Sequence, residues 1–224
     1  MVSRLANASV IGLLWAALSV QAPLQAVGQQ SQAAKRPRTA RPDLGKIADG
    51  AYQNPTFGFS YRIPFGWVDR TAAMQQADSA EPAAQPPKSQ VLLAVFERPP
   101  EAPRSAVNAG VVIAAESVSS YPGLKAAVEY FGPLEQVATS KGFKVLNEPY
   151  EFQVGGKSVA REDFSQEAGE MTMHQTFLVI LEKGYLVSFT LISDSDDAMD
   201  ELLEGLNFHP SLAPARSHPA SGKK

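Results

Sequence analysis

The chain has 224 residues, of which 44% are hydrophobic and 19% charged, an ordinary composition for a globular protein. It contains no cysteine, which excludes disulfide bonds, thiol catalysis, Cys-based zinc sites and a lipoprotein anchor. Between Asp43 and His209 there are 12 Lys and Arg against 23 Asp and Glu, a net charge of −11 that argues against nucleic-acid binding.

Residues 1–28 have the pattern of a secretory signal peptide. Arg4 supplies the charged start, and the apolar run Val10–Val20 is too short for a comfortable membrane span. We expect cleavage after Ala26 or Gly28, with an uncleaved anchor as the alternative. The pattern predicts a secreted or periplasmic protein without an integral membrane segment in its mature chain.

Both flanks of the remaining chain are basic and low in hydrophobic residues. Residues 29–45 form a Gln-, Ala-, Pro- and Arg-rich stretch, in which disorder is expected. Its basic residues are Lys35, Arg36, Arg38 and Arg41. We interpret it as a solvated spacer; contact with anionic lipid headgroups or envelope polymers is the alternative. Residues 210–224 form a Pro-, Ser- and Ala-rich tail, also expected to be disordered, which leaves a single domain at 46–209.

The domain opens with an aromatic stretch, Tyr52–Val68. Phe57, Phe59 and Tyr61 alternate and would share one face of a strand, which favours sheet core over a binding surface. The next segments are predicted as a Pro-containing loop at 71–89, a buried strand at 90–96, a second loop at 98–108 and an apolar strand at 110–118.

A helix is predicted at 122–140, with a kink or restart at Gly132-Pro133. Strands follow at 143–147, 150–154 and 157–164, and Gly155-Gly156 fits a two-residue hairpin turn between the last two. An amphipathic helix at 194–206 is expected to close the fold.

The strongest pattern is a β-hairpin at Glu170–Ser193, in which two apolar runs flank a short turn containing Gly184. Phe177 and Val179 would point to one side of the sheet, and Leu178 to the other, so this hairpin should lie mid-sheet with both faces covered. With the helices at 122–140 and 195–206 as covers, the sequence predicts an α+β fold with a central antiparallel sheet sandwiched between helices.

An acidic cluster begins the last predicted helix. Its members are Asp194, Asp196, Asp197, Asp200 and Glu201. A calcium loop would need a glycine at its sixth position and a terminal Glu at the right spacing, and both are missing. We therefore interpret the cluster as a helix cap with acids in the first turn.

His174 is the only histidine within a predicted core element. Strand pairing could bring Arg161, Glu162 or Asp163 near it, but no Gly-x-Ser-x-Gly nucleophile turn accompanies it. A metal site would need further ligands, so His174 is interpreted as an ordinary sheet residue. The three charges at 161–163 suggest cross-strand ion pairing, or alternatively an Arg that binds an anion. We assign no catalytic, cofactor-binding or metal-binding residue, and expect no enzyme and no cofactor.

The order of several short motifs resembles the PsbP-like family, named for an extrinsic subunit of photosystem II. The domain has Asn-Pro-x-x-Gly-Phe-Ser-Tyr-x-x-Pro-x-Gly-Trp at 54–67, Gly-Gly-Lys-x-x-Ala-Arg at 155–161, a Lys-Gly-Tyr-Leu turn at 183–186 and Leu-Asn-Phe at 206–208. The resemblance covers about residues 50–209. It implies an antiparallel sheet between helices and a role in binding or assembly.

The function expected from the sequence is that of an exported, non-enzymatic module that binds a protein or a cell-envelope component. One alternative is an exported domain that binds a small molecule or lipid in a pocket, lined by Phe and Tyr, between sheet and helix. A third is a hydrolase that uses His174 with Asp163, which would require contact between these two residues beside an exposed Ser or Thr.

Overall fold

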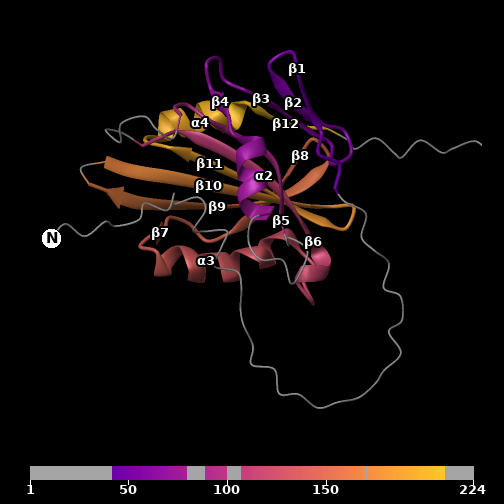
Figure 1. Cartoon of the computed structure of the whole chain (residues 1–224). Coiled ribbons are helices and arrows are strands. Elements are labelled where there is room, and N and C mark those ends of the chain that lie inside the picture. The colour runs from indigo at the N-terminus through magenta and orange to yellow at the C-terminus, as the bar shows by residue number, and fades with distance from the viewer. Residues whose placement is uncertain (1–41, 80–88, 100–106, 170, 210–224) are drawn as a thin grey trace, which may run out of the picture.

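The larger of two antiparallel sheets runs through the middle of the molecule (Figure 1). The computed structural model describes residues 42–79, 89–99, 107–169 and 171–209. Within them, the larger sheet has the spatial order β4-β5-β6-β11-β10-β9-β7, and β8 also pairs with β9. The strands are β4 Val68–Asp69, β5 Ser89–Phe96, β6 Gly110–Ser117, β7 Lys144–Val145, β8 Tyr150–Val154, β9 Lys157–Ala168, β10 Met171–Glu182 and β11 Tyr185–Ser193. All these pairings are antiparallel, which confirms the predicted central antiparallel sheet.

The β10–β11 hairpin lies inside this sheet, as its two-sided apolar pattern predicts. β10 pairs with β9 on its other side, and β11 pairs with β6. The turn between the two strands consists of Lys183 and Gly184, with φ angles of 51° and 82°. Positive φ at both turn residues gives the twist that a two-residue hairpin requires, and Gly184 adopts it without steric cost.

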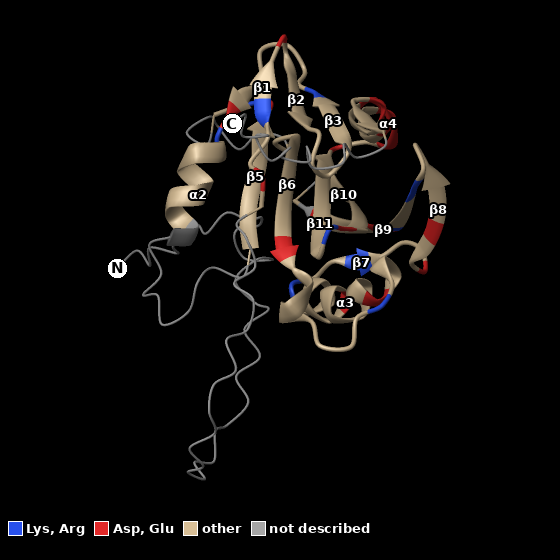
Figure 2. Cartoon of the chain, turned by 90° about the vertical axis from the view of Figure 1, so that its right-hand side faces the viewer, with Lys and Arg blue, Asp and Glu red and all other residues tan. Residues whose placement is uncertain are grey.

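One face of the central sheet is covered by a small sheet together with a helix (Figures 1 and 2). The small sheet has the order β1-β2-β3-β12. Its strands are β1 Lys46–Ala48, β2 Ala51–Asn54, β3 Phe59–Arg62 and β12 Leu206–Phe208, and the helix is α4 Asp196–Glu204. Phe57, Phe59 and Tyr61 are buried against the central sheet, which confirms the predicted sheet core for these three residues. Since much of this cover is a sheet, the predicted sandwich between helices holds in part.

Helices cover the opposite face of the central sheet. The 3₁₀ turn η2, Ala127–Tyr130, and helix α3, Phe131–Ser140, pack over β9, β10 and β11. Phe131 and Leu134 are buried there together with Phe164 and Phe177, whose rings meet edge to face at 5.4 Å. α3 lies below the central sheet in the view of Figure 1.

A third helix, α2, Thr71–Ser79, corrects the predicted loop at 71–89. Hydrogen bonds to β5 hold α2 in place: the amide of Ala94 donates to Thr71 Oγ1 at 3.0 Å, and Gln75 Nε2 donates to the Val91 carbonyl at 2.8 Å. The apolar side chain of Met74 also packs against β5 and β6. Tertiary contacts therefore stabilise a helix whose own sequence has little apolar periodicity. The rest of this predicted loop, and most of that at 98–108, lies outside the described residues.

The helix predicted at 122–140 begins later than expected, and its first part is irregular. Gly123 has a φ of 96°, and the 3₁₀ turn η1, Val118–Ser120, precedes it. The hydroxyls of Tyr121 and Tyr130 both donate to the buried carboxylate of Glu116 on β6. These bonds tie 121–130 to the sheet, and regular α-helix starts only at Phe131. Pro133 falls in the first turn of α3, where its missing N–H removes no helical hydrogen bond.

The predicted signal peptide, the tail and most of the linker lie outside the described residues. Within the described part, Asp43 and Leu44 already contact β2: Asn54 Nδ2 donates to the Asp43 carbonyl at 2.8 Å, and the Tyr52 hydroxyl donates to the Leu44 carbonyl at 2.8 Å. The residues from Asp43 onward, which the sequence pattern places in the linker, are thus packed against the domain. No helix in the described ranges has both the length and the hydropathy of a membrane span.

Candidate functional site

A small polar cavity brings together the residues that the sequence marks as candidates for chemistry. It has a volume of about 230 Å³ and lies between β9, β10, the chain before β8 and α4. Its polar lining includes Asn147, Arg161, Asp163, His174, Thr176 and Asp196. The strand registers place Asp163 opposite Thr176 and Ser165 opposite His174, so these groups share one region of the sheet.

Asp163 and His174 line this cavity but bond to different partners. Arg161 Nε donates to both carboxylate oxygens of Asp163 at 3.0 Å, and Thr176 Oγ1 donates to Asp163 at 2.6 Å. His174 Nδ1 lies 3.1 Å from Asp196 Oδ1 instead. The Thr176 hydroxyl proton is directed to a carboxylate rather than to a histidine, so the nucleophile–base arrangement of a hydrolase is not assembled here.

The start of α4 has the predicted arrangement of a capped helix with acids in its first turn, and the capping residue is Ser195. Ser195 Oγ accepts a hydrogen bond from the amide of Ala198, and Asp196 and Asp197 occupy the first turn. Negative charge at this end is favoured because the first amides of a helix point toward it. Across the described ranges, no group of three or more His, Cys, Asp or Glu side chains could hold a metal ion.

The three charged residues at 161–163 of β9 lie on both faces of the sheet. Arg161 and Asp163 pair with each other along one face, so the predicted ion pair forms within β9 rather than across strands, and the Arg is not held ready for an anion. Glu162 points to the opposite face and is fully buried. Burial raises its pKa to about 9, and the nearby carboxylates of Glu135 and Asp163 add to the shift. Glu162 is therefore uncharged at neutral pH.

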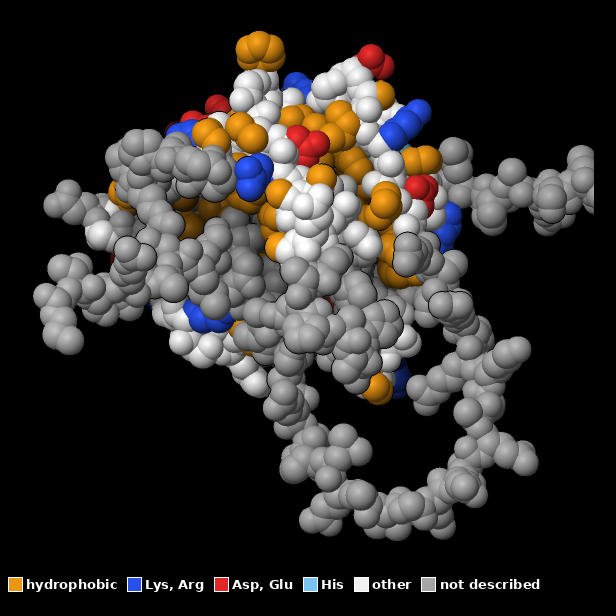
Figure 3. Space-filling model, viewed as in Figure 1, with side chains coloured by type: hydrophobic (Ala, Val, Ile, Leu, Met, Phe, Trp, Pro, Cys, Tyr) orange, Lys and Arg blue, Asp and Glu red, His pale blue; other side chains and the backbone are white. Residues whose placement is uncertain are grey.

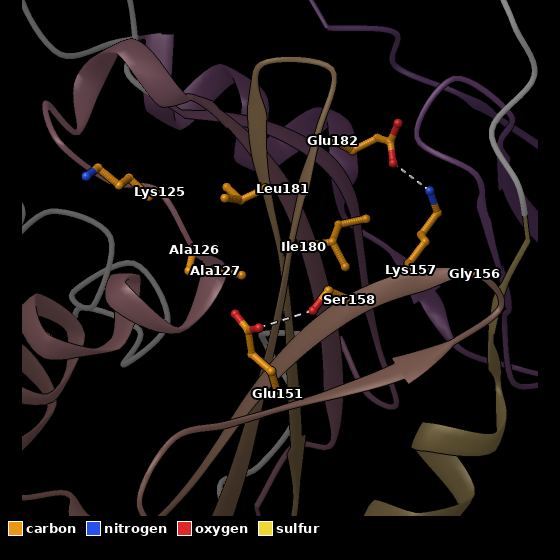
Figure 4. A pocket seen from close by; sticks show the side chains of 10 residues that line it. All are labelled: Lys125, Ala126, Ala127, Glu151, Gly156, Lys157, Ser158, Ile180, Leu181 and Glu182. Atoms are coloured by element: carbon orange, nitrogen blue, oxygen red, sulfur yellow. Dashed lines mark hydrogen bonds and ion pairs between the residues drawn. The ribbon is translucent and has the colours of Figure 1, made fainter.

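A second cavity, of about 350 Å³, opens where β9 and β10 separate (Figure 4). The pairing of the two strands ends at Ala160 and Val179. Beyond it, Lys157 Nζ and Glu182 Oε2 lie 2.7 Å apart across the gap. No aromatic side chain lines this cavity, and Phe164 is the sole one lining the first. Neither of these two cavities is therefore the Phe- and Tyr-lined pocket expected of a small-molecule carrier.

The most unusual surface is the edge strand β8. Among the large apolar side chains exposed in the described ranges, five of eight lie within 145–154: Val145, Leu146, Tyr150, Phe152 and Val154. Every residue of β8 is exposed. Tyr150, Phe152 and Val154 are 45%, 36% and 38% exposed and alternate along the strand, so they form one apolar row. The rings of Tyr150 and Phe152 are 6.0 Å apart.

The other exposed apolar side chains belong to the small sheet and its turns. Leu44 and Ile47 lie at β1, and Phe65, at 106% exposure, lies in the turn between β3 and β4. In the view of Figure 3, hydrophobic side chains at this end of the molecule lie among charged and polar ones. Only β8 combines a regular apolar row with an unpaired strand edge among the described strands.

The sequence predicts the bounds of β8 correctly, but it does not predict that the apolar row of this strand is exposed. The alternation of Tyr150, Phe152 and Val154 with Glu151 and Gln153 is the signal of a half-buried strand. That signal would normally place the apolar row in the core. Whether the row is buried depends on what packs over that face of β8, and this does not follow from the alternation itself.

No protein-family model and no curated protein sequence matches this chain. Solved structures with a similar fold include cyanobacterial PsbP (CyanoP) from Synechocystis sp. PCC 6803, at 14% identity and a TM-score of 0.46, covering 74% of this chain and 99% of that one. LpqN, involved in cell envelope biogenesis of Mycobacterium tuberculosis, has 14% identity and a TM-score of 0.35, covering 68% and 83%. The Saccharomyces cerevisiae Ran-binding protein Mog1p has 11% identity and a TM-score of 0.39, covering 67% and 90%.

The comparison thus returns the PsbP-like resemblance that the motif order indicates. At these identities and TM-scores the likeness is one of fold, and it carries no function to this chain.

Proposed function

We propose that this chain is an exported, non-enzymatic binding module whose edge strand β8 binds an extended segment of a partner protein. The observation that supports it is the apolar row of Tyr150, Phe152 and Val154 on a strand with one unpaired edge. Exposed rows of this kind on soluble domains are usually binding surfaces or aggregation hazards. Export rests on the signal-like sequence of residues 1–28.

A protein segment suits this surface better than lipid does. The free edge of a strand presents N–H and C=O groups that need hydrogen-bond partners. A bilayer interior cannot supply them, whereas an added strand satisfies them and can place apolar side chains beside the apolar row. A protein partner is therefore the occupant that matches both the backbone and the side chains of β8.

A non-enzymatic role fits the polar groups of the described residues. In the first cavity, Asp163 is bonded to Arg161 and Thr176, and His174 is paired with Asp196. In the second, Lys157 is paired with Glu182. The Thr176 hydroxyl donates to Asp163 rather than to His174, so this hydroxyl is not held by a histidine base.

Capture of partner proteins from the native cell envelope tests this proposal. The bait is the mature chain, compared with Phe152→Ser and with the control Phe65→Ser, which removes a still more exposed aromatic side chain from the turn between β3 and β4. We expect the Phe152→Ser chain to lose a protein that the wild type and Phe65→Ser both retain. Equal capture by all three chains, or a small molecule that co-purifies without a protein, would contradict the proposal.

A further inference from the structure

We infer that the partner segment adds to β8 as a strand in which apolar residues alternate with Lys or Arg. This inference rests on the proposed function and specifies the chemistry of the partner. Three features of β8 lead to it: the direction of its free backbone groups, the separation of its side chains onto two faces, and an excess of acidic charge.

The backbone groups available to a partner belong to Glu151 and Gln153. Val154 and Lys157 flank the two-residue turn Gly155-Gly156 and are register partners. In such a hairpin the pair next to the turn is hydrogen-bonded, and bonded pairs alternate along the ladder. The N–H and C=O groups of Val154, Phe152 and Tyr150 therefore point to β9, and those of Glu151 and Gln153 point to the free edge.

The two faces of β8 offer different chemistry to an added strand. Phe152 lies opposite Val159, which is buried in the core beneath the small sheet, so the apolar row lies on that face. Glu151 and Gln153 lie on the opposite face, toward η2 and α3, where the amide of Val128 donates to Glu151. Alternate residues of a bound strand would thus meet apolar and acidic surroundings in turn.

The charged side chain of β8 itself is acidic, and none of the ion pairs found in the described part of the chain neutralises it. The segment 146–156 contains Glu148 and Glu151 and no basic residue. The contacts of Glu151 are to neutral donors, the Val128 amide at 3.3 Å and Ser158 Oγ at 3.2 Å. Among the ion pairs of the described residues, none includes Glu151. Acidic colour also marks β8 in Figure 2.

A cationic strand complements this charge, whereas a second copy of the chain does not. Two β8 strands paired antiparallel about Phe152 would place their Glu151 carboxylates diagonally on one face, where they would repel. The net charge of −11 between Asp43 and His209 would also oppose self-association and favour the approach of a basic partner.

Two synthetic peptides test the inference: acetyl-Thr-Val-Lys-Val-Lys-Val-Thr-amide, and its counterpart with Glu in place of both Lys. Binding to the mature chain is measured by fluorescence polarisation of labelled peptide. We expect the Lys peptide to bind about tenfold more tightly than the Glu peptide, and Glu151→Lys to reverse this preference. Gln153→Pro should abolish binding of both peptides, because it removes an N–H that faces the partner and not β9.

The matched control is Glu201→Lys, which makes the same charge change at an exposed position of α4. It should leave the preference for the Lys peptide unchanged. Circular dichroism of each variant confirms that the fold is retained.

Three results would overturn the inference. The first is a loss of preference in Glu201→Lys as large as in Glu151→Lys, which would indicate long-range attraction only. The second is a concentration-dependent dimer that Gln153→Pro abolishes, which would assign the edge to a second copy. The third is failure of the Lys peptide to bind while Phe152→Ser still loses its envelope partner, in which case the proposed function stands without this inference. If Phe152→Ser loses nothing, the proposed function itself fails.

Discussion

Lys157 and Glu182 form an ion pair, with Nζ and Oε2 2.7 Å apart, at the point where β9 leaves β10. Their side chains are 7% and 22% exposed, so both charges are largely removed from water. The pair continues the strand register after main-chain pairing has ended at Ala160 and Val179. It therefore fixes the base of the β8–β9 hairpin, which presents the proposed binding edge.

The first prediction concerns this ion pair. Glu182→Gln should lower the free energy of unfolding by about 2–3 kcal/mol, because it leaves the Lys157 ammonium buried without its carboxylate. The double change Lys157→Met with Glu182→Leu should cost less than Glu182→Gln alone, since no charge remains to be compensated. Urea unfolding measures both. A double variant less stable than the single one would show that the ion pair stabilises the fold more than apolar side chains do at these positions.

The second prediction concerns Glu162 and pH. The pKa of this carboxyl rises from an ordinary value of 4.5 to about 9 in the folded protein. Between these values the unfolded chain is ionised at Glu162 and the folded chain is not, so its contribution to stability falls as pH rises, by at most about 1.4 kcal/mol per pH unit. The stability that Glu162 contributes is fully present below its unfolded pKa of 4.5. It is lost as the pH rises to the folded pKa of about 9.

Glu162→Gln removes this titration. From about pH 5 to about pH 8 we expect the variant to gain about 2–4 kcal/mol of stability relative to the wild type. Guanidinium unfolding at the two pH values measures the difference. Parallel pH dependence in the two proteins would mean that Glu162 ionises normally within the fold.

The third prediction uses the hairpin turn between β8 and β9. Gly155 and Gly156 both have positive φ, 57° and 76°, so alanine is strained at either position. A Cβ on Gly155 would lie 2.1 Å from the carbonyl oxygen of Phe208 at the end of β12, whereas a Cβ on Gly156 would meet nothing within 4 Å. Gly155→Ala should therefore cost about 1–3 kcal/mol more than Gly156→Ala. Equal thermal unfolding temperatures would rule out close packing of β12 on this turn.

The fourth prediction compares two aromatic residues of the opening stretch. Phe59 is fully buried, and its ring meets that of Phe189 at 4.8 Å, edge to face. Phe59→Ala should lower the free energy of unfolding by about 3–5 kcal/mol. Phe65→Ala, at a fully exposed position, should change it by less than about 0.5 kcal/mol. A similar loss in both variants would argue against the small sheet as part of the main core.

Local alternation was enough to predict the central hairpin, because Phe177 and Leu178 require cover on opposite faces wherever the strand lies. Pairing between strands that are distant in the sequence could not be predicted in this way. β1 and β12 have three residues each and join one small sheet from opposite ends of the domain, so no local pattern marks them. α2 is held by hydrogen bonds to β5 rather than by its own periodicity, and it was predicted as a loop.

The candidate site, like the fold, could be predicted from the sequence only in part. The residues of β8 and the charges at 161–163 were recognised as patterns, but their roles depend on position in the sheet. Glu162 and Asp163 are neighbours in sequence, yet one is buried beneath α3 and the other bonds to Arg161 and Thr176 beside a cavity. Phe152 is exposed and lies on a strand that pairs on one side only among the described strands.

Hydrogen exchange of the β8 amides, followed by NMR, tests the central claim most directly. In the free protein the amides of Glu151 and Gln153 should exchange quickly, and those of Phe152 and Val154 slowly, because only the latter point to β9. When the envelope partner, or the Lys-containing peptide, is added in excess, we predict that Glu151 and Gln153 become protected by at least about tenfold. Unchanged exchange at both amides in the presence of a bound partner would show that β8 is not the binding edge.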